Sequence, residues 1–213
     1  MERVLIICGS AGRGGTTEAM CQSAAAAFRE APSDALIVFP SEMEIRHCTG
    51  CDLCGSGRCV IDDDMSRLYK LFAESDLVIL ATPLHFNGPS SLMKTVMDRF
   101  QVYWRGSGLP HPKAAMGLIC AGSDEPNFSP TLSIMRAFAA TTGMKWVGEV
   151  CISGTDRDGD ARVDEAVRAG VSGLIEKGMG ISKSLMGDQT SCGGQRRRRR
   201  TACRRTRHPI PRR

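Results

Sequence analysis

Apolar runs alternate with amphipathic stretches along most of the chain. Five apolar runs predict β-strands at residues 4–8, 35–39, 77–83, 114–123 and 146–152. The run at 35–39 is uniformly apolar, as a parallel strand buried on both faces would be. Apolar residues at helical spacing predict five helices. The first begins at Thr17, and the others span 62–73, 89–104, 130–142 and 160–177, with Pro89 as the first residue of the third helix. Strands that alternate with helices predict one α/β domain, whose doubly wound five-stranded parallel sheet carries helices on both faces.

The ligand position follows from this fold class. In such sheets a ligand binds beyond the carboxyl ends of the strands, where the strand order reverses. The order cannot be read from the sequence. If it is 2-1-3-4-5, the loops after strands one, three and four meet in one crevice, and their sequences are GSAGRGGTT, TPLHFNGP and AGSDEPNFSP.

The first of these loops is suited to an anion. It leads from a strand into a helix, whose unpaired N–H groups and positive dipole end favour a phosphate. Ser10, Thr16 and Thr17 add hydroxyl donors, and Arg13 adds positive charge. A glycine-rich turn without a ligand is the alternative.

The loop lacks what two common phosphate-binding motifs require. Gly15 stands where the nucleotide triphosphatase pattern that starts at Gly9 needs a lysine. No alignment of the loop glycines completes the dinucleotide pattern G-x-G-x-x-G. A monophosphate such as that of FMN needs neither motif, and it fits the loop.

Two stretches resemble one protein family. The loop GSAGRGGTT resembles that of the NAD(P)H-dependent FMN reductases, a flavodoxin-like family. The stretch ATPLHFNGPSSLMKTVMDRF resembles a strand, loop and helix of the same family, and it matches the family pattern at Thr82, Pro83, Ser91, Lys94, Asp98 and Arg99. The resemblance covers about residues 3–178, and it implies a flavodoxin-like fold, bound FMN and NAD(P)H as electron donor.

The resemblance also implies which residues contact the flavin. The phosphate would lie on Ser10, Arg13, Gly15, Thr16 and Thr17. The ring would lie between two further loops, which contribute Pro83, Leu84, His85, Phe86 and Asn87 on one side and Ala121, Gly122 and Ser123 on the other. Phe86 and Asn87 depart from the usual family residues. Hydride transfer to a flavin needs orientation more than a protein acid, so we name no general base.

Four cysteines lie close together after the second strand. Cys48, Cys51, Cys54 and Cys59 have the spacing C-x2-C-x2-C-x4-C, and such short intervals wrap a chain around a polynuclear centre. The run resembles that of the iron–sulfur flavoproteins, which implies a [4Fe–4S] cluster near FMN. Many flavin reductases carry a similar stretch without an established cluster, so redox-active or structural thiols and a zinc site are alternatives.

Two further sets of residues have structural explanations. Cys8, Cys120 and Cys151 fall within predicted strands, so we expect them to be buried as small apolar residues. The acidic run 62–64 stands at a predicted helix start, where we interpret it as capping and solvation rather than metal binding.

Positive charge is concentrated at the carboxyl end. Residues 1–187 hold 18 Lys and Arg against 22 Asp and Glu, whereas residues 188–213 hold ten Arg and one Asp. This composition predicts a disordered Arg-rich tail at 188–213, after an FMN-binding domain at 1–187 that contains the cysteine loop 48–59. The tail has no aromatic residue, helical periodicity or lysine. We therefore favour a frameshifted or read-through terminus over nucleic-acid binding.

The sequence also predicts a cellular compartment and a function. No apolar run approaches the roughly 18 residues of a membrane span, and the first run is too short for a secretory signal. We therefore expect a cytoplasmic protein, in which ten cysteines favour metal, cluster or redox chemistry. The predicted function is an FMN-dependent NAD(P)H oxidoreductase that passes electrons to a quinone, a flavin or an iron–sulfur acceptor.

Two other functions and the assembly state stay open. The alternatives are a ferredoxin-linked iron–sulfur flavoprotein without nicotinamide turnover and a non-enzymatic metal-binding regulator. The resemblance implies a homodimer or homotetramer that uses a nicotinamide donor and a small-molecule or ferredoxin-like redox partner. We expect the exposed end of the third predicted helix, near Tyr103 and Trp104, to form the contact between copies.

Overall fold

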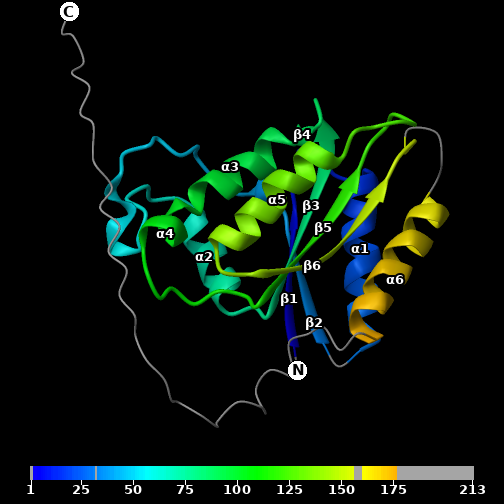
Figure 1. Ribbon diagram of the computed structural model, residues 1–213, viewed down its shortest axis with the longest axis horizontal. Helices are drawn as coiled ribbons and strands as arrows, with labels where there is room; N and C mark the ends of the chain where they lie inside the picture. Colours follow the sequence, from blue (N-terminus) through cyan, green and yellow to red (C-terminus); the bar gives the residue numbers. More distant parts are fainter. Residues whose placement is uncertain (1, 32, 156–159, 177–213) are drawn as a thin grey trace, which may run out of the picture.

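The computed structural model describes residues 2–31, 33–155 and 160–176 (Figure 1). Its sheet consists of the parallel strands β1 (Glu2–Cys8), β2 (Ser33–Val38), β3 (Leu77–His85), β5 (Ala114–Cys120) and β6 (Lys145–Ile152). The strand order is β2-β1-β3-β5-β6. This order reverses between β1 and β3, so the loops after β1, β3 and β5 meet at the carboxyl edge. The predicted doubly wound parallel sheet is confirmed.

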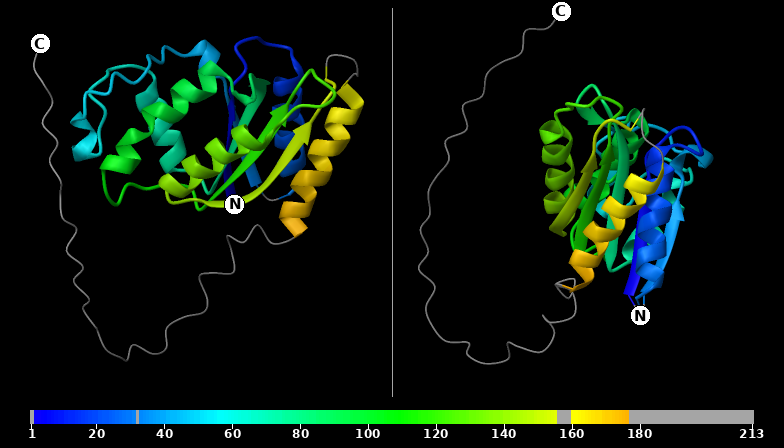
Figure 2. Two further views of the ribbon diagram at one scale, coloured as in Figure 1. Left: turned by 45° about the horizontal axis from the view of Figure 1, so that its top comes forward. Right: turned by 90° about the vertical axis from the view of Figure 1, so that its right-hand side faces the viewer.

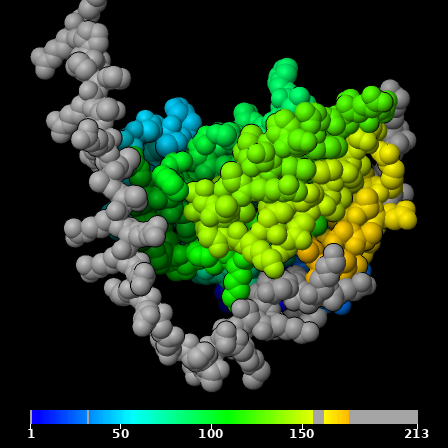
Figure 3. Space-filling view, viewed as in Figure 1, coloured from blue at the N-terminus to red at the C-terminus, as the bar shows by residue number. Residues whose placement is uncertain are grey.

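Helices cover both faces of the sheet (Figures 1 and 2). One face packs against α1 (Thr16–Arg29) and α6 (Asp160–Glu176), and the other against α2 (Met65–Ala73), α3 (Ser91–Arg99) and α5 (Ser129–Thr141). Figure 3 shows the side of the molecule that carries the second set of helices, where α5 and β6 lie at the surface. Side chains of β1 alternate between the two cores, because Ile6 faces α1 and α6 while Ile7 faces α2 and α3. The same alternation holds along the buried strands β3 and β5.

Two predictions about strand burial are wrong because they concern the sheet edges. We expected residues 35–39 to be buried on both faces, but β2 is an edge strand and Leu36 is 46% exposed. We also expected Cys151 to be buried, but it is exposed. Its neighbours Val150 and Ile152 pack under α1 and α6, so Cys151 points to the opposite face of the edge strand β6.

The predicted third helix differs in two places. Pro89 lies in the two-residue strand β4 (Gly88–Pro89), which pairs antiparallel with β3, and the Ser90 hydroxyl caps α3 by accepting from Met93 N at 3.0 Å. The helix also breaks at Phe100, after which α4 (Gln101–Arg105) begins. Phe100 packs against the rings of Phe72, Tyr103 and Phe138, and this aromatic cluster favours the bend.

The loop between β2 and α2 carries the four cysteines. It contains two short 3-10 helices, η1 (Pro40–Glu42) and η2 (Leu53–Ser56). In Figure 1 this loop (cyan) extends from the side of the molecule opposite α6, beside α4. The predicted tail at 188–213 lies outside the described residues. Within the described residues, no helix combines the length and apolar character needed to cross a membrane.

Candidate functional site

A cavity of about 420 Å³ opens at the carboxyl edge of the sheet. Its volume is in the range of small-molecule sites, roughly 300–1,000 Å³. The loops after β1, β3 and β5 form most of its wall, as the sequence predicted from their expected convergence. The lining residues are Ser10, Ala11, Gly12, Thr16, Thr17, Pro83, Leu84, His85, Cys120, Ala121, Gly122 and Thr155.

The N-terminus of α1 gives this cavity its anion-binding chemistry. Gly15 is the N-cap, its backbone is extended, and no side chain caps the first turn of the helix. The first-turn N–H groups are therefore left for a ligand. Thr16 is half-buried, and Thr17 is buried with Oγ1 3.2 Å from the sulfur of Cys120. This contact joins the helix start to the end of β5.

Arg13 binds neighbouring carboxylates instead of lining the cavity. Its Nε and Nη2 donate to Glu18 at 2.9 and 2.8 Å, its Nη1 donates to Glu42, and its guanidinium carbon lies 3.6 Å from the centre of the Phe39 ring. Glu18, which is 6% exposed, also accepts from Gly14 N at 2.7 Å. The Arg13 guanidinium and then the Gly14 N–H hold the pKa of Glu18 at about 2. This ionised pair fixes the shape of the loop.

Hydrogen bonds between loops fix the floor of the cavity. Thr82 Oγ1 accepts from Ser90 N at 3.0 Å, and the Ser90 hydroxyl donates to the carbonyl oxygen of Gly9. A Cβ atom at Gly9 would lie 2.7 Å from Cβ of Met93, so the close approach of the first loop to α3 requires glycine.

The predicted ring-binding loops are only partly turned toward the cavity. Leu84 and His85 line it, whereas Phe86 and Asn87 form the tip of the β3–β4 hairpin with φ of 50° and 62°. Phe86 is fully exposed, and the carbonyl oxygen of Asn87 accepts from Thr131 Oγ1 at 2.9 Å. Ser123 lies beyond the lining residues, and its carbonyl oxygen accepts from Gly154 N at 2.8 Å.

Some of the predicted site residues therefore line the cavity, and others do not. The structure gathers Ser10, Thr16, Thr17, Pro83, Leu84, His85, Ala121 and Gly122 around the cavity, and it places Arg13, Gly15, Phe86, Asn87 and Ser123 outside the lining. Four lining residues were not predicted as site residues: Ala11, Gly12, Cys120 and Thr155. Thr155 had a readable signal, because the stretch Ser-Gly-Thr at 153–155 directly follows the last strand and therefore lies at the same edge.

A second cavity, of about 360 Å³, lies in the cysteine loop. All four loop cysteines line it, together with residues of α3 and α4. The full set is Cys48, Thr49, Gly50, Cys51, Asp52, Cys54, Cys59, Ile61, Asp98, Gln101, Trp104 and Arg105. Burial, and then the nearby thiols of the other three cysteines, raises the pKa of Cys54. Across residues 2–31, 33–155 and 160–176, no three His, Cys, Asp or Glu side chains are grouped closely enough to hold a metal ion. The four thiols thus surround a space instead of converging on one point.

The chain is similar to several known flavin-dependent proteins. The family described as NADPH-dependent FMN reductase matches residues 2–158. An iron–sulfur flavoprotein of Archaeoglobus fulgidus is 33% identical over 121 residues, which cover 56% of this chain and 55% of that protein. The chain thus spans about half the length of that relative.

Two further proteins match a larger share of the chain. A Bacillus subtilis protein, YwqN, named as a candidate NAD(P)H-dependent FMN-containing oxidoreductase, is 24% identical over 184 residues, which cover 82% of this chain and 97% of that protein. The NAD(P)H:quinone oxidoreductase of Methanothermobacter marburgensis superposes with a TM-score of 0.66 at 15% identity, over 82% of this chain and 97% of that one. The second likeness shows a shared fold.

Proposed function

The chain belongs to the NADPH-dependent FMN reductase family, and from this membership we propose that it is an FMN-dependent NAD(P)H oxidoreductase. The observation that carries the proposal is the carboxyl-edge cavity, which joins the uncapped start of α1 to the loops after β3 and β5. When bound, FMN would accept a hydride from NAD(P)H and pass the electrons to a quinone, a flavin or an iron–sulfur acceptor.

The phosphate of FMN would bind at the N-terminus of α1. The N–H groups of the first turn and the hydroxyls of Ser10, Thr16 and Thr17 are its donors. The Ser10 hydroxyl donates to Gly12 O at 3.0 Å, so this side chain also supports the loop backbone. Arg13 acts indirectly: it neutralises Glu18, whose charge would otherwise repel a phosphate beside it.

The flavin ring would lie between the segments Pro83–Asn87 and Ala121–Ser123. Backbone N–H groups near the pyrimidine edge of the ring would stabilise the negative charge that builds on reduction. Leu84 and Ala121 supply apolar walls, which exclude water from one part of the ring. His85 lines the cavity and is exposed, so it can contact an acceptor or the nicotinamide without acting as an acid.

The cysteine loop would hold a [4Fe–4S] cluster. Four thiols around one cavity match the needs of a polynuclear centre, whose ligands are spaced around the cluster and not on one ion. The iron–sulfur flavoprotein among the relatives supports this proposal. When bound, the cluster would exchange single electrons with a partner. Two alternatives compete with the cluster: the same cysteines could bind zinc, or they could act as redox-active thiols without a metal.

The cysteine cavity also favours a second candidate function. A protein with FMN and a cluster can be an electron carrier that exchanges electrons with a ferredoxin-like partner and does not turn over nicotinamide. Steady-state oxidation of NADH and NADPH separates the two functions. The proposed reductase should oxidise one of them, with a quinone as acceptor, faster than an equal concentration of free FMN. A rate equal to that of free FMN would favour the carrier.

The variant Thr16→Val tests the position of the phosphate. It keeps the branched shape of the side chain and removes the hydroxyl, so FMN should bind about 10-fold more weakly, which corresponds to about 1.4 kcal/mol for a hydrogen bond to a charged group. The matched control is Thr141→Val at the exposed end of α5, which should leave FMN affinity unchanged. Equal FMN affinity in Thr16→Val and the wild type would refute the assignment of this residue.

A further inference from the structure

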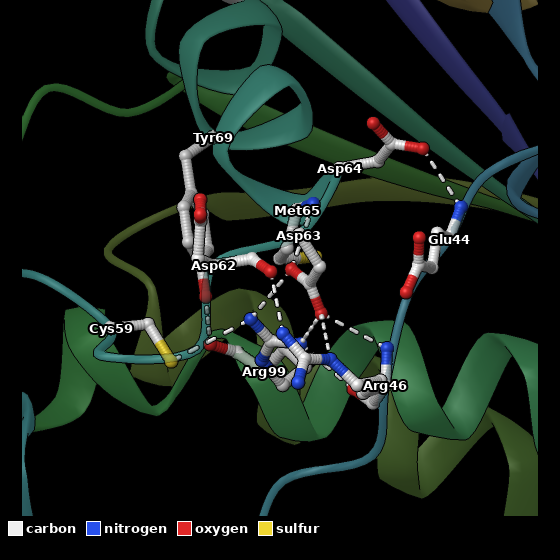
Figure 4. Close-up of polar contacts among 9 residues, drawn as sticks. All are labelled: Glu44, Arg46, Cys59, Asp62, Asp63, Asp64, Met65, Tyr69 and Arg99. Carbon is white, nitrogen blue, oxygen red and sulfur yellow. Dashed lines mark hydrogen bonds and ion pairs between the residues drawn. The ribbon is translucent and has the colours of Figure 1, made fainter.

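The cysteine loop is closed at its base by hydrogen bonds between residues 44–46 and 63–64 (Figure 4). Asp64 N donates to Glu44 O at 3.0 Å, and Asp64 Oδ2 accepts from Glu44 N at 2.8 Å. Asp63 Oδ2 accepts from Arg46 N at 3.0 Å. These bonds hold together the two ends of the segment that contains all four cysteines, so the loop has a fixed base independent of any ligand.

Arg99 crosses this base from the end of α3. Its side chain is 1% exposed, and that of Asp63 is 0% exposed. Its Nη1 and Nη2 donate to Oδ2 and Oδ1 of Asp63 at 2.6 and 3.0 Å, and Nη1 also donates to Arg46 O at 2.8 Å. Asp63 Oδ1 in turn accepts from Met65 N at 3.1 Å at the start of α2. One buried ion pair therefore connects α2, α3 and the entry to the cysteine loop.

The same guanidinium contacts a cysteine. Arg99 Nη2 donates to the sulfur of Cys59 at 3.6 Å, and Figure 4 shows Cys59 pointing toward it. Among the described residues, none of the other three loop cysteines receives a hydrogen bond from a cationic side chain. The Tyr69 hydroxyl donates to the backbone carbonyl of Arg99, and this bond holds the arginine from the side of α2. Arg99 is buried and Cys59 is half-buried, so the contact is partly shielded from water, which strengthens it.

We propose that Arg99 is a positioning residue for Cys59 as a ligand of the cluster. The Asp63–Arg99 pair fixes the guanidinium, and the guanidinium fixes the Cys59 sulfur at the cavity wall. The N–H···S bond also withdraws negative charge from the sulfur, and such bonds raise the reduction potential of a cluster. This inference rests on the cluster proposed above.

The variant Arg99→Lys tests the inference in whole protein purified without oxygen. Lysine keeps the positive charge but cannot bind the carboxylate and the sulfur with one planar group. We expect a more negative midpoint potential of the cluster, measured by redox titration, and roughly 10- to 100-fold weaker iron retention against a chelator. The FMN content should stay at the wild-type level, because Arg99 does not line the carboxyl-edge cavity. Arg136→Lys, in an exposed pair with Glu149, is the matched control and should change neither quantity.

A second variant covers the case in which Arg99→Lys does not fold. Asp63→Leu/Arg99→Met replaces the buried pair with apolar side chains, which proteins often tolerate, and should give the same shift in potential. Iron and sulfide are measured first in the wild type, and their absence refutes the proposed cluster together with this inference. A wild-type cluster whose potential and iron retention are unchanged in both variants refutes the role of Arg99 alone.

Discussion

Buried carboxylates at two places in the structure are held ionised by arginine. Glu18 binds Arg13 beside the carboxyl-edge cavity, and Asp63 binds Arg99 at the base of the cysteine loop. Burial alone would raise the pKa of Asp63, but the Arg99 bonds and the N–H groups of Arg46 and Met65 outweigh burial, so the pKa is lowered. Each pair therefore contributes to stability only while its carboxylate keeps its charge.

Acid should weaken the first loop through Glu18. The pKa of Glu18 is about 2 in the folded chain against 4.5 ordinarily, so its contribution is complete above about pH 4.5 and is lost as the pH falls toward 2. Urea unfolding of the wild type and Glu18→Gln should give a stability difference that shrinks across this window. A difference that does not depend on pH would contradict the assignment.

Removal of one partner of the Asp63–Arg99 pair should be costly. Asp63→Asn leaves the Arg99 charge buried and uncompensated, so the free energy of unfolding should fall by about 3–5 kcal/mol in urea denaturation. Asp98→Asn is the control, because Asp98 pairs with Lys94 at the surface. Loss of such an exposed pair should cost less than about 1 kcal/mol. Equal losses in the two variants would show that burial of the first pair has no energetic consequence.

Substitution at Gly9 should disturb the cavity floor. The added Cβ of Gly9→Ala would approach Cβ of Met93 at 2.7 Å and Ala81 O at 3.0 Å, and overpacking of this kind costs about 1–3 kcal/mol. Thermal unfolding measures the loss. The control is Gly173→Ala in α6, which meets no atom within 4 Å and should stabilise the helix by about 0.5–1 kcal/mol. A Gly9→Ala variant as stable as the wild type would mean that the loop can move away from α3.

The elements follow closely from the hydrophobic pattern, and the errors have local causes. Periodicity identifies the strands and most helices because each buries one face or two. It does not distinguish an edge strand from a central one, so Leu36 and Cys151 were assigned to the interior. The break at Phe100 depends on aromatic rings of α2 and α5, which no local pattern contains.

Substitutions at the tip of the β3–β4 hairpin should raise the stability of the protein. Phe86 and Asn87 both have left-handed φ, which bulky residues such as phenylalanine adopt at a cost of roughly 1–2 kcal/mol. Phe86→Asn/Asn87→Gly installs the residue pair that such two-residue turns prefer. The free energy of unfolding should rise by about 1 kcal/mol in urea titrations, because the fully exposed Phe86 loses little packing. A decrease would contradict this account and show that Phe86 has packing partners elsewhere.

Two of the cavities among the described residues have different chemistry. One lies at the carboxyl edge of the sheet, and the other lies in the cysteine loop beside α4. The sequence predicted most of the residues that line the first cavity and all four cysteines of the second, since a glycine-rich loop and a run of cysteines are local patterns. It did not predict that Arg13 would bind Glu42, nor that Asp63 would be buried with Arg99, because both pairings join residues distant in the chain. The acidic run 62–64, interpreted as capping and solvation, includes the fully buried carboxylate of Asp63.

The most direct test of the account is the amount of iron and acid-labile sulfide per FMN in protein purified without oxygen. We predict flavin with about four irons and four sulfides per FMN. Flavin without iron would contradict the cluster and leave a flavin reductase whose cysteine loop is structural or redox-active. Protein that binds neither FMN nor iron would contradict the proposed function itself.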